Sequence, residues 1–499
     1  MLRKLLGLPL TIAVGVSLAS LPGGPASGDP VTVGTKGNEP LIAIAPDRTI
    51  VISALQHLYA STDGGQTFFA VAEPPFAAEL NLNSDSSINF DPAGRLYFTF
   101  DWPYAGSTAV CTTDSPIGPA PTWSSNPAAM PGGTDRMWIL APTTAAAYAV
   151  TNEGLYETTF LLSTDRGATW QPTGVGPGLL EPQTGPLLSD PAHTHVFQVA
   201  KDNGELGFYV YSPAEAGQVV GEFRSTGAGT PLALPSGAFG TDGSLWTATE
   251  AANASGGRQV IVLESSDQGL HWTTLAPVPG TTSGTATFTW VAAGAPGHVG
   301  VLFYWTPSNG DPGALTGATW DVRWAETFDA TALSPHWSVT TLESGIHTGP
   351  ICIAADCTGS NRFAGDFISS TFDPDGGAHL TWMRDAPVTI RYEHVVGRVD
   401  APPPLLPARH WLGRPAPNPS RSAVLIRFGI ARETAVSLAL YDPSGRMVRG
   451  LVAERLPAGV HEARWDGRDA SGHRVASGLY FVRLAVDGQA FRSRVVLMP

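Results

Sequence analysis

The sequence lacks the features that mark helical, membrane-spanning and nucleic-acid-binding proteins. Helical hydrophobic periodicity is nearly absent from its 499 residues, and after residue 28 no apolar run is long enough to span a bilayer. The formal net charge is -14, whereas nucleic-acid backbones are bound through clustered Lys and Arg. We therefore expect no nucleic-acid partner. A chain of this length also exceeds one hydrophobic core, which predicts several domains or a repeat architecture.

Cysteine is scarce, with three residues in the whole chain. Cys352 and Cys357 stand close together in "ICIAADC" and are predicted to form a disulfide, which leaves Cys111 unpaired and buried. A zinc site needs two more ligands at similar spacing, and none is visible beside this pair. We expect no metal site and no cofactor, with calcium left open as an occupant of an acidic surface.

The N-terminal stretch "MLRKLLGLPLTIAVGVSLASLPGGPASG" has two cations, an apolar run and then small residues. This order predicts a secretory signal peptide over residues 1–28. A membrane anchor is the alternative, but Pro9 interrupts the run and a Pro/Gly/Ser tract ends it, which favours cleavage. We therefore expect a secreted or cell-surface protein on the outer-membrane exterior, without a transmembrane helix after cleavage.

One eight-residue phrase occurs three times: "STDGGQTF" from residue 61, "STDRGATW" from residue 163 and "SSDQGLHW" from residue 265. Extended apolar segments flank each copy, which predicts a hairpin tip. There the Asp accepts backbone N–H groups, the Gly takes a positive φ and the aromatic residue packs on the next layer. The residues given this structural role are Ser61, Asp63, Gly65, Phe68, Ser163, Asp165, Gly167, Trp170, Ser265, Asp267, Gly269 and Trp272.

A second pattern, strand, Pro/Asp/Gly turn and strand, occurs seven times, and degenerate copies of the phrase give a period of about 50 residues. Four short strands in each period are typical of a β-propeller, in which each blade buries its neighbours. The fold class expected is all-β: a seven-bladed β-propeller over residues 31–400, with six blades as the alternative. The segment "DPVTVG" near Val31 is expected to add a closing strand to the last blade. The seven units begin at Glu39, Asp85, Asp135, Gly185, Ser236, Phe288 and Gly365.

The phrase S-x-D-x-G-x-T-W resembles the Asp-box of the BNR, or sialidase-like, β-propellers, and the resemblance covers roughly residues 34–400. It implies the propeller fold. The same phrase occurs in propellers that hydrolyse glycans, in receptors and in assembly factors, so it does not specify the chemistry.

The last 99 residues differ in composition from the rest of the chain. Residues 401–499 contain 14 Arg, no Lys and 7 acidic residues, a net charge of +7 that leaves -21 for the remainder. A Pro-rich linker is predicted over 401–414. Alternating apolar and polar residues with turns at "DPSG", "DGRDASG" and "VDG" predict a small Ig-like β-sandwich over 415–499, with Trp465 in its core.

The segments "PNPS", "YDPSGRMV" and "WDGRDASGHRVASGLYF" are similar to the FlgD-like Ig domain and to the C-terminal sorting domains of type IX secretion. The resemblance implies export across the outer membrane or attachment at the cell surface, and contact with secretion machinery. The alternative is an accessory Ig module that acts as a spacer.

Propeller topology places the starts of first strands and the ends of second strands at one mouth of the central channel, opposite the repeated phrase. Carboxylates, arginines and aromatic residues at one mouth can hold a sugar or a cation, or can simply pair with one another at a wet surface. The predicted ligand-binding residues are Glu39, Asp85, Asp101, Asp135, Arg136, Arg362, Asp366, Trp382, Arg384 and Asp385.

The resemblance to sialidases implies three arginines, an early F/Y-R-I-P motif and a Tyr nucleophile. Lys36 and Asn38 stand where the first Arg is expected, and no F-R-I-P occurs. Arg136, Arg362 and Arg384 form a triad only by assumption, and no catalytic residue can be assigned. Tyr104, Tyr304 and Tyr392 are equivalent nucleophile candidates.

We therefore expect an exported protein that recognises a glycan or another extracellular ligand, such as a protein, at the channel mouth. A glycoside hydrolase, either a divergent exo-sialidase or an enzyme using paired carboxylates such as Asp85 and Asp135, is one alternative. A structural or adhesive cell-surface protein is the other.

Overall fold

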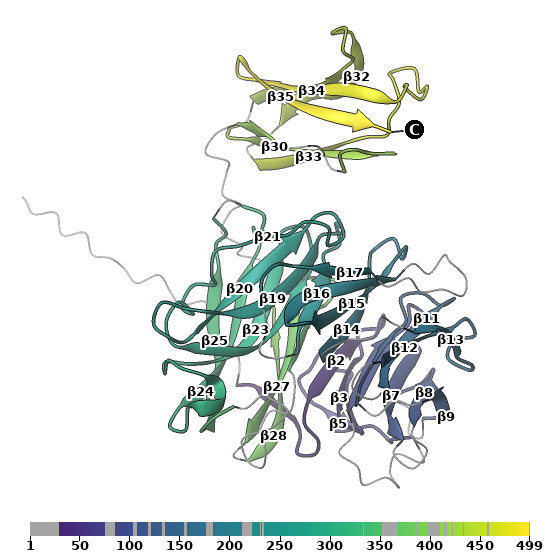
Figure 1. The fold of residues 1–499 in the computed structure, drawn as a ribbon, viewed down its shortest axis with the longest axis vertical. Coiled ribbons are helices and arrows are strands. Elements are labelled where there is room, and N and C mark those ends of the chain that lie inside the picture. The colour runs from purple at the N-terminus through teal and green to yellow at the C-terminus, as the bar shows by residue number, and fades with distance from the viewer. Residues whose placement is uncertain are drawn as a thin grey trace, which may run out of the picture.

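The computed structural model describes residues 29–498, except 75–84, 103–106, 118–120, 132–134, 154–156, 176–182, 212–221, 230, 232–233, 333, 352–367, 386, 397–409, 414, 416, 422, 433 and 457–458. The predicted signal peptide and the Cys352–Cys357 disulfide lie outside the described residues. The protein is all-β, with many small sheets in a large body and a separate C-terminal sandwich (Figure 1). Within the described part, no helix has the length and apolarity that a membrane crossing requires.

Four sheets of four antiparallel strands follow one another along the chain, each with its strands paired in chain order. They comprise β2 (Pro40–Ile44), β3 (Ile50–Ala54), β4 (His57–Ser61) and β5 (Phe69–Ala70); β6 (Ser86–Phe90), β7 (Leu96–Trp102), β8 (Ser107–Thr113) and β9 (Ser124–Pro131); β10 (Asp135–Leu140), β11 (Ala147–Glu153), β12 (Glu157–Ser163) and β13 (Gln171–Val175); and β14 (Gln183–Ser189), β15 (Val196–Asp202), β16 (Glu205–Tyr211) and β17 (Glu222–Ser225).

The next sheet has eight strands but consists of two four-stranded parts, because a single parallel bridge, Arg258 to Thr285, joins β20 to β22. A 3-10 turn, Pro312–Ala314, separates β23 from β24. The strands are β18 (Ser236–Phe239), β19 (Leu245–Ala252), β20 (Arg258–Ser265), β21 (Thr273–Thr274), β22 (Thr285–Ala293), β23 (Val299–Thr306), β24 (Thr319–Thr327) and β25 (Ser338–Thr348).

The last sheet of the large body contains the first strand of that body together with its last three strands. Its strands are β26 (Ser369–Phe372), β27 (Ala378–Asp385), β28 (Val388–Val395) and β1 (Val31–Gly34). The N-terminal β1 pairs antiparallel with β28, where Val31 lies opposite Tyr392 and Thr32 lies opposite Arg391. The segment near Val31, for which the sequence predicts a strand beside the last unit, thus supplies the fourth strand of this sheet.

Each of the seven strand–turn–strand units forms an antiparallel pair that begins a four-stranded set. The seven first strands, β2, β6, β10, β14, β18, β22 and β26, are neighbours in this order, and β26 in turn lies beside β2. The second strands of these sets are buried on both faces, as in β3, whose five residues "IVISA" are all buried. This explains why the inner strands are nearly continuous apolar runs instead of alternating patterns.

The repeated phrase forms the turn between the third and fourth strands of three sheets. In the first copy the Ser61 hydroxyl donates to Asp63 Oδ1 (2.7 Å) and accepts the Gly65 N–H (2.9 Å). Asp63 also accepts the Thr67 N–H (3.0 Å) and hydroxyl (2.6 Å). The copies at Asp165 and Asp267 repeat this pattern. The turn therefore satisfies its own backbone donors and folds locally.

The aromatic residue that ends each copy packs on the preceding sheet. Trp272 stacks on Phe208 of β16, with ring centroids 5.3 Å apart, and Trp170 shares a buried cluster with Tyr97 of β7. Phe68, in the first sheet, meets Tyr392 of the last sheet edge-on at 4.9 Å. These contacts connect the sheets in sequence and the first with the last.

The C-terminal body is a sandwich of two sheets around its own core. Trp465 is fully buried there and packs edge-on against Tyr480. Arg427 also donates to Asp242 of the large body at 3.0 Å. Because β29 pairs with β30, this sandwich begins by Trp411, inside the stretch predicted as linker. The strands are β29 (Trp411–Leu412), β30 (Val424–Ile430), β31 (Thr434–Tyr441), β32 (Met447–Leu456), β33 (Gly459–Trp465), β34 (Gly478–Val486) and β35 (Gln489–Leu497).

Candidate functional site

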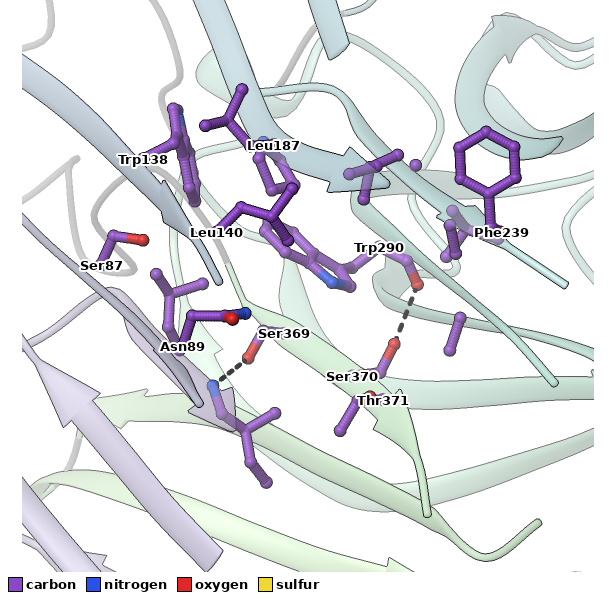
Figure 2. Close-up of a pocket in the computed structure, with 18 of the residues that line it drawn as sticks. Ser87, Asn89, Trp138, Leu140, Leu187, Phe239, Trp290, Ser369, Ser370 and Thr371 are labelled. Carbon is purple, nitrogen blue, oxygen red and sulfur yellow. Dashed lines mark hydrogen bonds between the residues drawn. The ribbon is translucent and has the colours of Figure 1, made fainter. Parts of the chain in front are cut away.

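A cavity of about 330 Å³ lies between the seven first strands and is lined by residues of each of them (Figure 2). The ring of Trp290, from β22, lies between the strands, near Leu140 and Leu187 (Figure 2). Trp138 and Phe239 add two further aromatic side chains to the lining. Most of the hydroxyl and amide groups of the lining come from β6 and β26, and Ser189 of β14 adds one more, so the side of β6 and β26 is the more polar side of the cavity.

Polar side chains at the cavity wall join neighbouring first strands. Ser87 and Asn89 of β6 accept the backbone N–H groups of Ile139 (3.2 Å) and Ala141 (2.9 Å). Ser369 of β26 accepts the Ile42 N–H of β2 at 3.0 Å. These side chains therefore accept backbone N–H groups that have no partner within their own sheet. The bonds hold neighbouring first strands together and so fix the width of the cavity.

No charged side chain of the described residues lines this cavity. Its lining combines large aromatic and aliphatic surfaces with a few hydroxyl and amide groups, as in sites that bind neutral small molecules. An anionic ligand would lose hydration here without meeting a cation, which is unfavourable. The chemistry available is stacking and neutral hydrogen bonding.

Three of the predicted mouth residues lie together at the end of β27, where they contact β25. Trp382 is fully buried and donates its indole N–H to Glu343 Oε2 at 2.9 Å. Arg384 donates to Glu343 Oε1 at 2.6 Å, and Asp385 Oδ2 lies 2.6 Å from His347 Nδ1. These three side chains therefore bond to neighbouring side chains and do not line the central cavity.

Glu343 is the centre of this group, because its carboxylate accepts from three side chains. The third donor is Arg391 of β28, whose Nε lies 3.2 Å from Glu343 Oε2 and whose guanidinium also donates to Thr32 of β1. The Glu343 side chain is only 8% exposed. This arrangement, which we call the Glu343 clasp, connects β25, β27, β28 and β1. Within it, Arg384 and Trp382 of β27 are bonded to a carboxylate of the neighbouring β25.

For the remaining predicted mouth residues, the structure describes only some of the positions and side chains. Glu39 is buried directly before β2 and has φ of 53°. Asp85 is partly buried directly before β6. Asp101 is on β7, and Asp135 and Arg136 are on β10, but their side chains lie outside the described set. Arg362 and Asp366 lie outside the described residues altogether. Because the Asp135 side chain is not described, a mechanism with paired Asp85 and Asp135 stays a prediction.

The candidate tyrosine nucleophiles differ in environment. Tyr304 and Tyr392 are fully buried, and burial raises the pKa of both phenols. The Tyr304 hydroxyl accepts the Met383 N–H at 3.2 Å, within the packing between sheets. A buried phenol with a raised pKa is a weak nucleophile, so neither residue has the environment of the sialidase nucleophile. Tyr104 lies outside the described residues.

Sequence reasoning did not single out Glu343, His347, Trp138 or Trp290. Glu343 and His347 lie on β25, the outer strand of its set, which carries no part of the repeated pattern. Trp138 and Trp290 lie in apolar inner strands, where an aromatic residue is expected simply as core. A comparison of the seven units with one another shows one difference that points to these residues: Trp occurs in the first strands of only some units.

One family model matches the chain, over residues 428–489. This stretch is a FlgD Ig-like domain. The FlgD Ig-like domain thus covers most of the C-terminal sandwich, in agreement with the resemblance found in the sequence. No curated protein matches the chain.

Solved structures of low identity resemble the arrangement of strands. An ulvan lyase of polysaccharide lyase family PL25 shares 10% identity, covers 74% of this chain and 94% of its own, and has a TM-score of 0.46. The intramolecular trans-sialidase from Ruminococcus gnavus shares 13% identity over 74% of this chain and 97% of its own, with a TM-score of 0.36. PorZ, a surface component of the type IX secretion system of Porphyromonas gingivalis, shares 14% identity over 92% of this chain and 70% of its own, with a TM-score of 0.21. At these scores the matches carry no argument about function.

Proposed function

We propose that this chain is an exported binding protein built on a closed seven-bladed β-propeller, and that the central cavity accepts the neutral end of an extracellular glycan. The observation that carries the proposal is the lining of the cavity, with Trp138, Trp290 and Phe239 beside Ser, Thr and Asn side chains and no charge among the described residues. Sugar rings offer an apolar face for stacking on aromatic side chains and hydroxyl groups for neutral hydrogen bonds.

The absence of charge from the described lining favours a neutral sugar over a sialoside. A sialoside carboxylate needs arginine donors, and Arg384 is directed to Glu343. Ser370 and Thr371 of β26 lie on the polar side of the cavity, where sugar hydroxyls would meet them (Figure 2). In this proposal the FlgD Ig-like domain carries the propeller outside the cell, as an attachment module or as a contact for secretion machinery.

A binding experiment tests the proposal with a cavity-filling variant. The purified chain is screened against an array that holds neutral and sialylated glycans, and the best neutral hit is titrated by calorimetry. Leu140→Trp adds an indole at the cavity wall and should weaken binding by at least about tenfold. Leu270→Trp makes the same change at a residue that is 58% exposed and should leave binding unchanged.

Two results contradict the proposal. Binding of sialylated glycans alone would show that an arginine-containing site, and not the cavity, holds the ligand. Equal affinity of wild type and Leu140→Trp for a neutral glycan would place the ligand elsewhere on the molecule.

A further inference from the structure

Two histidines lie directly opposite each other on the last sheet of the large body. His379 on β27 is the register partner of His394 on β28, and the two strands run side by side (Figure 1). Their imidazole rings stack with centroids 4.2 Å apart. Asp373, in the turn between β26 and β27, directs one carboxylate oxygen at both rings. No part of the proposed glycan site uses these three residues.

We propose that Asp373, His379 and His394 bind a zinc ion. Asp373 Oδ2 lies 3.3 Å from His379 Nε2 and 3.7 Å from His394 Nε2, and the three ligand atoms lie within 4.8 Å of one another. Zinc bonds of about 2.0–2.2 Å in a tetrahedron place neighbouring ligand atoms roughly 3.3–3.6 Å apart. The two distances from Asp373 Oδ2 suit one ion shared by the carboxylate and each nitrogen. The two imidazole rings, 17° from parallel, must turn toward each other so that both lone pairs meet the ion, which leaves a fourth position for water.

The outer contacts orient these groups as ligands. Asp373 Oδ1 accepts the backbone N–H groups of Asp375 and Gly377, each at 2.8 Å, which leaves Oδ2 for the ion. His379 Nδ1 lies 2.7 Å from the Tyr392 hydroxyl, so its other nitrogen, Nε2, points to Asp373. Such second contacts fix the ring orientation and tautomer of metal-binding histidines.

The nitrogen of His394 provides an independent sign of a missing partner. Its Nε2 is buried and makes no hydrogen bond among the described residues, although a buried polar atom normally has one. Arg48 is the cation nearest to the carboxylate, but its guanidinium pairs at 2.6 Å with Asp375 and stands 3.9 Å from Asp373. An ion beside Asp373 Oδ2 would satisfy His394 Nε2 as well.

Gly377 keeps the space for these ligands open. A Cβ at this position would lie 2.5 Å from His394 Nε2 and 3.0 Å from Asp373 Oδ2. The backbone of Gly377 is not in the left-handed region, so the need for glycine here is steric and local. Alanine at 377 would push the ligands apart without straining its own backbone.

The donor set selects the class of metal. Two imidazole nitrogens and one carboxylate suit zinc and other first-row transition metals, whereas calcium and magnesium prefer shells made only of oxygen. The ion would join the β26–β27 turn to β27 and β28, in the sheet that β1 completes. This proposal departs from the expectation, drawn from the sequence, that the chain holds no metal site.

The test is a zinc titration of the full chain after treatment with a chelator, with competition against a fluorescent zinc indicator and metal content by mass spectrometry. Wild type should bind one zinc per chain, and His379→Ala, His394→Ala and Asp373→Asn should each weaken binding by at least about tenfold. Gly377→Ala should do the same with all three ligands present. His271→Ala, at an exposed His beside Asp267, is the matched control and should bind as wild type does.

Cobalt substitution gives a second readout that does not depend on variants. Cobalt in a site with two His nitrogens and a carboxylate should show the visible absorption of a four-coordinate ion, and zinc should displace it. Three results would overturn the proposal. They are the absence of saturable zinc binding, a zinc affinity in all four site variants equal to that of wild type, and an affinity for calcium as high as that for zinc. If a ligand variant fails to fold, Gly377→Ala and the cobalt spectrum decide the question.

Discussion

Phe68, at the tip of the first hairpin, packs edge-on against Tyr392 of β28, with ring centroids 4.9 Å apart and an angle of 64° between the rings. The two residues are far apart in the sequence and belong to the first and last sheets of the large body. Next to them, Gly65 has φ of 90°, and a Cβ there would lie 2.2 Å from the Tyr392 ring. The repeated phrase thus builds its own turn and also carries the contact that joins the two ends of the series.

Phe68→Ala should lower the free energy of unfolding by about 2 kcal/mol, because it removes an aromatic pair and part of a buried surface. The neighbouring Phe69→Ala is the matched control. Its side chain is 44% exposed, and its loss should cost less than about 0.5 kcal/mol. Urea denaturation followed by tryptophan fluorescence measures both values. Equal effects of the two changes would show that the Phe68–Tyr392 contact contributes nothing.

Glu343→Ala should destabilise the large body by about 3 kcal/mol, since it leaves the largely buried Arg391 without its carboxylate. This loss of stability is at the lower end of the range for buried ion pairs, because the second arginine, Arg384, is partly exposed to solvent. Glu222→Ala removes a carboxylate that is 65% exposed and pairs with Arg224, and should cost less than about 1 kcal/mol. A Glu343→Ala protein as stable as Glu222→Ala would refute the structural role of the Glu343 clasp.

Acid should weaken the first repeated turn. Hydrogen bonds from the Thr67 hydroxyl and N–H, and from Ser61, lower the pKa of Asp63 to about 2. A lowered pKa stabilises the fold fully above the unfolded value of about 3.9, and this stabilisation is lost as pH falls toward about 2. The urea midpoint of wild type should therefore fall more steeply between these pH values than that of Asp63→Asn. Parallel profiles would contradict the assigned hydrogen bonds.

Thiol counting tests the cysteine assignments. Burial raises the pKa of the Cys111 thiol to about 12, so the folded protein should not react with a thiol reagent at pH 8. After unfolding without reductant, the predicted Cys352–Cys357 disulfide leaves one reactive thiol, and reduction should give three. Three thiols without reductant would exclude the disulfide. If the unfolded chain shows a single thiol, a reactive thiol in the folded state would contradict the burial of Cys111.

Features set by local chemistry could be predicted from the sequence. The turns at Asp63, Asp165 and Asp267 depend on side chains within eight residues, and the strand near Val31 is visible as alternating Val and Thr. The clasp and the cavity could not be predicted, because they depend on which strands become neighbours. The charged residues Arg384 and Asp385, close to Trp382 in the sequence, predicted a polar, solvent-exposed channel mouth. Their partners, Glu343 and His347, lie on a strand of another sheet, which the sequence does not reveal.

The pairing of His379 with His394 could be predicted from the sequence. Residues 379 and 394 are equidistant from the turn that follows Asp385, so a hairpin centred there places them opposite each other. Asp373 could not be added from spacing alone, because the β26–β27 turn brings it over both rings.

Hydrogen exchange of the N-terminal strand tests the central proposal, that seven four-stranded sets form a ring that β1 closes by pairing with β28. The amides of Val31–Gly34 that pair with β28 should exchange much more slowly than those of an unstructured chain, because they belong to the β1–β28 ladder. Exchange of the β1 peptide at the rate of an unstructured chain, while the β28 peptide stays protected, would show that the ring is open.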